Sequence, residues 1–76
     1  MMRYYRRYLV GGEYVYARTQ GVDRADRCYP SDPGWVRDDE LEAEIQFTGN
    51  WAPASAEEAE AAAAVAAARA QSAVAA

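Results

Sequence analysis

Hydrophobic and polar residues form their clearest pattern over residues 3–18, where two β-prone runs rich in tyrosine, valine and arginine flank Gly11-Gly12. Aromatic and β-branched residues favour strands, and glycine reaches the positive φ angles that tight hairpin turns need. The pattern therefore predicts a β-hairpin whose strands are joined by a two-residue glycine loop.

A two-residue loop gives the two faces of this hairpin different side chains. One face combines Tyr4, Arg6 and Tyr8 with small residues of the second strand, and it suits a covered core. The other face gathers the six side chains that we take as the candidate binding surface: Arg3, Tyr5, Arg7, Tyr14, Tyr16 and Arg18. These side chains could stack on bases or on an acidic, aromatic-seeking peptide, or they could pack on each other and only cover the sheet. A register slip of one residue would exchange the two faces.

The pattern that follows the hairpin predicts a third strand. Residues 20–24 are polar and turn-like, and residues 25–29 form a short run that returns as a strand. The loop over residues 30–34 contains two prolines and a glycine, which prevent strand or helix from continuing.

Residues 38–48 favour a short acidic helix. The segment begins with carboxylates, has apolar residues at Leu41 and Ile45, and is followed by Gly49. A fourth strand over residues 42–48 is the alternative, because alternate residues there are also apolar.

The C-terminal segment predicts an alanine-rich helix that begins near Ala56. Ser55 and Glu58 have the spacing of a capping box, in which each side chain bonds to the other residue's backbone amide. Val65 and Arg69 do not extend an apolar stripe, so we expect the helix to dock through its first turns, extend into solvent and fray at its end. Its small residues also permit a close helix–helix contact.

These elements predict an α+β fold: a three-stranded antiparallel meander, a short acidic helix or fourth strand, and a C-terminal alanine-rich helix. Residues 1–54 would form a small β-rich domain and residues 55–76 the helix. Large apolar residues are scarce in the 76-residue chain, so we expect Trp35 and Trp51 to serve the core rather than a binding site.

Charge is distributed unevenly. Residues 1–27 hold six arginines against three acids, a net charge of +3, and residues 28–76 hold two arginines against nine acids, a net charge of −7. The two halves should attract each other, within one fold or across a homodimer. The net negative charge disfavours nonspecific binding to duplex nucleic acid.

The residue types that carry catalysis are mostly missing. The chain has no histidine and no lysine, and its single Cys28 has the setting of a small buried residue rather than a nucleophile. The consecutive acids from Asp38 to Glu40 lack the alternate spacing of a calcium loop, and no glycine-rich phosphate loop is present. We therefore expect no enzyme activity, no cofactor and no metal. A lone cysteine and an alanine tail interrupted by Arg69 predict a cytoplasmic protein without a membrane span.

Several short motifs resemble short, uncharacterised proteins of high-GC actinobacteria and their phages. They are Arg3-Tyr4-Tyr5, Tyr16-Ala17-Arg18, Pro33-Gly34-Trp35-Val36, and Trp51 with Ser55-Ala56-Glu57-Glu58-Ala59. These proteins have no known activity that the resemblance could assign to this chain.

The sequence as a whole predicts a small protein-interaction or regulatory module that binds a protein partner through the arginine–tyrosine face. Single-stranded nucleic-acid binding on the same face is the alternative.

Overall fold

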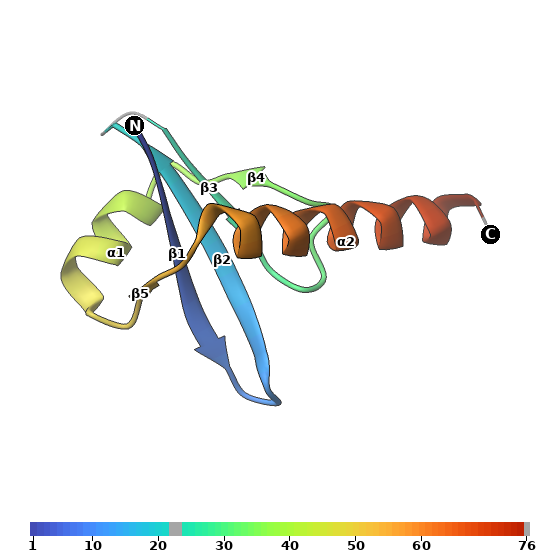
Figure 1. The fold of residues 1–76 in the computed structure, drawn as a ribbon, viewed down its shortest axis with the longest axis horizontal. Coiled ribbons are helices and arrows are strands. Elements are labelled where there is room, and N and C mark those ends of the chain that lie inside the picture. Colours follow the sequence, from blue (N-terminus) through green and yellow to red (C-terminus); the bar gives the residue numbers. More distant parts are fainter. Residues whose placement is uncertain (22–23, 76) are drawn as a thin grey trace.

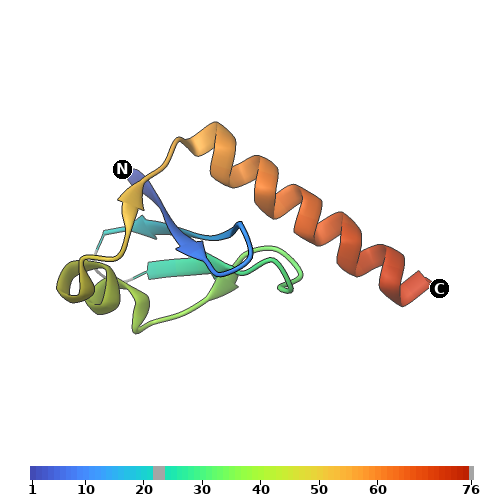
Figure 2. The ribbon, with the colours of Figure 1, turned by 90° about the horizontal axis from the view of Figure 1, so that it is seen from below.

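The computed structural model describes residues 1–21 and 24–75, and these residues form an antiparallel five-stranded sheet with a helix against each face (Figures 1 and 2). The sheet has the strand order β4-β3-β2-β1-β5. The elements along the chain are β1 (Met2–Leu9), β2 (Glu13–Gln20), β3 (Arg24–Cys28), β4 (Val36–Arg37), α1 (Leu41–Thr48), β5 (Ala52–Pro53) and α2 (Ala56–Ala75). The α+β class and the three-stranded meander are confirmed. The meander also gains two edge strands of two residues each.

The hairpin loop has three residues rather than the predicted two. Leu9 pairs with Glu13, which leaves Val10, Gly11 and Gly12 in the loop. The backbone N–H of Gly12 donates to the carbonyl of Leu9 at 3.3 Å, and Gly11 and Gly12 have φ angles of 103° and 87°. Loops of three residues with left-handed glycine are a common hairpin solution. The predicted register is therefore wrong by one residue.

This slip changes which residues share a face. Even-numbered residues of β1 and β2 face α2, and odd-numbered residues face α1. We call these two faces of the sheet the α2 side and the α1 side. The predicted turn over residues 20–24 includes residues 22 and 23, which lie outside the described residues.

The core on the α1 side is built from small residues. Ala17, Ala25 and Leu41 are buried together, and Tyr5, Ile45 and Trp51 pack around them while staying partly exposed. Residues 41–48 form the predicted helix, which excludes the alternative strand.

The core on the α2 side is smaller still. Cys28, Ala63 and Ala66 are buried together, with Trp35 packed against them. Both tryptophans thus contact the core, as predicted. Gly34 approaches this helix closely, with φ of 118°.

The helix α2 docks through its first turns and continues beyond the sheet, which confirms the prediction (Figure 1). Only one of the two hydrogen bonds of the predicted capping box forms at the start of α2. The Glu58 amide donates to Ser55 Oγ at 3.0 Å, but the Glu58 side chain binds Arg6 and Tyr16 on the sheet instead of returning to Ser55. The expected fraying concerns the end of the helix, where residue 76 lies outside the described part. No helix within the described ranges is long and apolar enough to cross a membrane.

Candidate binding surface

The six residues of the predicted surface lie on opposite sides of the sheet. Tyr14, Tyr16 and Arg18 are on the α2 side, whereas Arg3, Tyr5 and Arg7 are on the α1 side. The predicted single lattice is therefore wrong, because a three-residue loop shifts one strand against the other and a shift of one residue reverses every side chain.

Glu58 of α2 binds one cross-strand pair on the α2 side. Arg6 and Tyr16 are directly opposite each other in the sheet. Arg6 Nη1 lies 2.7 Å from Glu58 Oε2, and the Tyr16 hydroxyl donates to the same oxygen at 2.9 Å. These two hydrogen bonds lower the pKa of Glu58, while burial and then the bond to Glu58 raise the pKa of Tyr16 to about 12.

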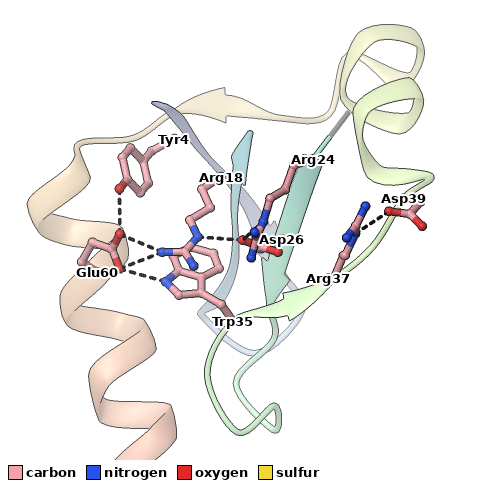
Figure 3. A network of polar contacts seen from close by, with 8 residues as sticks. All are labelled: Tyr4, Arg18, Arg24, Asp26, Trp35, Arg37, Asp39 and Glu60. Carbon is pink, nitrogen blue, oxygen red and sulfur yellow. Dashed lines mark hydrogen bonds and ion pairs between the residues drawn. The ribbon is translucent and has the colours of Figure 1, made fainter. Parts of the chain in front are cut away.

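Glu60 binds the next cross-strand pair, Tyr4 and Arg18, together with Trp35 (Figure 3). It accepts the Tyr4 hydroxyl at 2.7 Å, the Trp35 indole N–H at 2.8 Å and Arg18 Nη1 at 3.1 Å. Arg18 also stacks over the Trp35 ring at 4.5 Å and bonds to the buried Asp26 at 2.9 Å. The hydrogen bonds from Tyr4 and Trp35, and the charge of Arg18, lower the pKa of Glu60, and the bond to Glu60 raises the pKa of Tyr4.

The centre of the α2 side is thus satisfied from within the chain. The basic hairpin and the acidic second half attract each other inside one fold, which is one of the two arrangements that the charge distribution predicts. Arg6 and Arg18 have carboxylate partners, and so they are not free to bind a ligand.

The end of the hairpin beyond this network carries exposed apolar side chains. Tyr8 is 63% exposed, Val10 is fully exposed, and Tyr14 packs edge-on against Tyr8 with ring centroids 5.6 Å apart. Between this end of the hairpin and α2 lies a groove of about 230 Å³, which we call the distal groove. Its walls include Tyr14, Tyr16, Pro30, Ala62, Val65, Ala66 and Arg69.

A second cluster lies on the α1 side, where the hairpin extends past α1 (Figure 1). The Arg7 guanidinium stacks over Trp51 with 5.3 Å to the ring centroid and donates to the Tyr29 hydroxyl at 3.3 Å. Arg27 stacks over Tyr29 and forms an ion pair with Asp38 at 3.0 Å. We call Arg7, Tyr29, Arg27 and Trp51 the arginine platform.

Arg7 differs from the other half-buried arginines of the sheet. Within residues 1–21 and 24–75 it has no ion pair, whereas Arg6 has one and Arg18 and Arg27 have two each. Its Nε and the indole N–H of Trp51 are buried without an acceptor. Arg3, the remaining predicted arginine, is exposed and lines a shallow pocket with Tyr5 and Glu42.

Cys28 has the environment of a core residue, as predicted. The side chain is buried, and burial together with the nearby Asp32 raises the pKa of its thiol. The thiol is therefore protonated at neutral pH and enclosed by α2. Among the described residues, no group of three or more His, Cys, Asp or Glu side chains is arranged to hold a metal ion.

The sequence alone does not predict the distal groove or the arginine platform. Val65 and Arg69 meet the hairpin only because α2 docks at its particular angle, and Trp51 meets Arg7 only in the observed register. The residue that could have indicated the groove is Val65, a β-branched residue that interrupts a run of alanines. Comparison with known protein families, with curated proteins and with solved structures gives no match.

Proposed function

We propose that the protein is a small protein-interaction module without catalytic activity, and that it binds its partner at the distal groove. The observation that carries this proposal is the placement of large apolar side chains. The fully buried large side chains among the described residues are Leu41 and Val15, yet Val65 is 55% exposed in the wall of the distal groove, and Tyr8 is exposed beside the groove residue Tyr14. A chain with so little core leaves this apolar surface at one end of the molecule.

The groove has the residue types that favour protein contacts. Tyrosine presents a large, stiff ring with a polar tip, and such rings dominate binding hot spots. Tyr8, Tyr14 and Tyr16 are held by mutual ring contacts, and Arg6 stacks 4.9 Å over Tyr14, so little side-chain entropy is lost on binding. Covering an exposed valine contributes about 1.5–3 kcal/mol. Arg69 at the rim would pair with a carboxylate of the partner.

Single-stranded nucleic-acid binding has weaker support. It requires free guanidinium groups beside free rings, whereas Arg6 and Arg18 are paired with Glu58 and Glu60. Nucleic-acid binding would weaken steeply as salt concentration rises, and a contact centred on tyrosine and valine would weaken less.

The experiment that tests the proposal places a photo-crosslinking residue at Val65 in the groove wall, and at the exposed Gln20, at the end of β2 away from the hairpin loop, as a control, and identifies what each captures in extract of the source cells. We expect a protein captured from Val65 alone. Binding of that protein is then measured for Tyr14→Ala with Val65→Ser, against Phe47→Ser as the matched control.

The double variant should lose most of the affinity for the captured protein, while Phe47→Ser should retain it. Equal capture from both positions, capture of nucleic acid, or full affinity of the double variant would contradict a protein site at the distal groove.

A further inference from the structure

The exposed flank of α1 combines negative charge with an aromatic ring. Glu40, Glu44 and Phe47 follow one another at spacings of four and three residues, which places them on one flank of the helix. Phe47 is 83% exposed, and in the described part of the chain Glu40 and Glu44 have no ion pair. Leu41 and Ile45 face the core, so Glu40 and Phe47 are exposed, and Glu44 is half-buried at the border of this flank.

The arginine platform offers the opposite charge on the same side of the sheet. Arg7 lacks a counter-ion in the described chain, and its buried Nε lacks an acceptor. The ring of Trp51 lies beside it, and Leu9 on the same side of β1 is only half-buried. Arg7 of the platform therefore lacks a carboxylate, whereas Arg27 pairs with Asp38, and the platform has uncovered apolar surface. The α1 flank supplies a carboxylate and an uncovered phenyl ring.

We propose that two copies of the chain associate face to face through their α1 sides, with α1 of each copy on the arginine platform of the other. The two complementary patches lie next to each other on one side of the molecule. A two-fold axis would place α1 of each copy on the arginine platform of the other, so the same contact forms twice, as it does in isologous dimers. Each α1 carboxylate then meets the partner's Arg7, and each Phe47 covers Trp51 and Leu9 of the other copy.

This association is separate from the proposed function, because the groove residues Tyr14, Tyr16 and Val65 lie on the α2 side, although Tyr29 belongs both to the groove wall and to the arginine platform. A dimer through α1 leaves both grooves open, and a monomer could still bind through its groove. The two ideas therefore succeed or fail independently.

The first test is sedimentation of the full chain over a concentration series, at low and at high salt. We expect a monomer–dimer equilibrium that weakens as salt concentration rises, because charge pairs across the interface are screened. Phe47→Ser should raise the dissociation constant at least about tenfold, whereas Val65→Ser, at an exposed apolar position on α2, should leave it unchanged. A chain that stays monomeric at every concentration would overturn the proposal.

Charge exchange gives the sharper test. Arg7→Glu alone and Glu44→Arg alone each place like charges together twice across the dimer, so each variant should be monomeric. An equimolar mixture of the two should dimerise, since the mixed dimer has one native pair, Glu44 with Arg7, and one pair with its charges reversed. Arg69→Glu, a charge reversal on α2, serves as the control and should dimerise like the unmodified chain.

Circular dichroism of each variant confirms that the fold is retained. If the mixture stays monomeric, or if Arg7→Glu dimerises as well as the unmodified chain, the contact between α1 and the platform is wrong even where a dimer exists.

Discussion

Removing the Glu60 carboxylate should destabilise the fold far more than removing its neighbour Glu57. Glu60 accepts hydrogen bonds from three donor residues, Tyr4, Trp35 and Arg18, whose shortest distances are 2.7, 2.8 and 3.1 Å. In Glu60→Ala all three donors lose their acceptor at once. Glu57 lies three residues earlier, in the first turn of α2, and is exposed, so Glu57→Ala controls for helix propensity and for charge near the helix N-terminus.

The magnitude follows from exposure as well as from bond count. A hydrogen bond to a charged group contributes about 1.5–3 kcal/mol when its partners are shielded from water. The Glu60 side chain is 44% exposed, so water replaces part of what is lost, and we expect about 2 kcal/mol for the three bonds together. A domain of this size has a free energy of unfolding of roughly 4–11 kcal/mol. The loss corresponds to a fall in melting temperature of about 8–16 °C.

Urea unfolding followed by tryptophan fluorescence and by circular dichroism measures this difference directly. Trp35 contacts Glu60, so its fluorescence reports on the site, while circular dichroism reports on the helix. Glu60→Gln retains an acceptor without the charge and should be intermediate. If Glu60→Ala costs no more than Glu57→Ala, the network contributes nothing to stability and the account of how α2 docks is refuted.

Four other predictions concern titration, the reactivity of the Cys28 thiol and backbone strain. The pKa values of Glu58 and Glu60 are lowered from 4.5 in the folded state, so the stability that these carboxylates contribute is present above pH 4.5 and lost as the pH falls through the lowered values. The urea midpoint should fall in that pH range, and it should fall less in the variant with glutamine at both positions. The pKa of Tyr16 is raised from 10.0 to about 12, so its contribution is present below pH 10 and lost between pH 10 and 12, and Tyr16→Phe should remove that part of the alkaline loss in urea titrations. A thiol reagent should label Cys28 only as fast as the protein unfolds, and labelling of the native state at the rate seen in urea would contradict its burial. Gly34→Ala should cost about 1–3 kcal/mol in the same urea assay because the backbone there has φ of 118°, and an unchanged midpoint would show that the loop relaxes without strain.

The local elements were predictable because each depends on a few adjacent residues. The glycines require a turn between the first two strands, and Ser55 provides the N-terminal cap of α2 whatever the rest of the chain does. The acidic start and the spacing of Leu41 and Ile45 predict α1 in the same way. These signals act within one turn of helix or one loop, so the elements form where they are predicted even when a tertiary contact redirects a side chain, as it does for Glu58.

The hairpin register was not predictable from the same signals. Loops of two and of three residues both place Gly11 and Gly12 at positive φ, so the glycines do not distinguish them. Hydrophobic patterning usually decides the register, because one face must be buried. Here arginine and tyrosine occur on both faces of β1, and neither choice is clearly the more apolar.

The contacts of α2 determine the hairpin register. Because these contacts join residues far apart in the sequence, the predicted binding surface was wrong although the predicted fold class was right. Only the observed register sets Arg6 opposite Tyr16 and Tyr4 opposite Arg18, and each of these pairs converges on a single carboxylate. Glu58 and Glu60 lie on either side of the fully buried Ala59, so the helix presents both carboxylates to the sheet when that alanine docks. Alanine buries little area, and so the docking of α2 depends on these polar contacts more than on apolar burial. A register shift would break both sets of contacts together, and the two glutamates, some forty residues further along the chain, therefore stabilise the pairing of the hairpin.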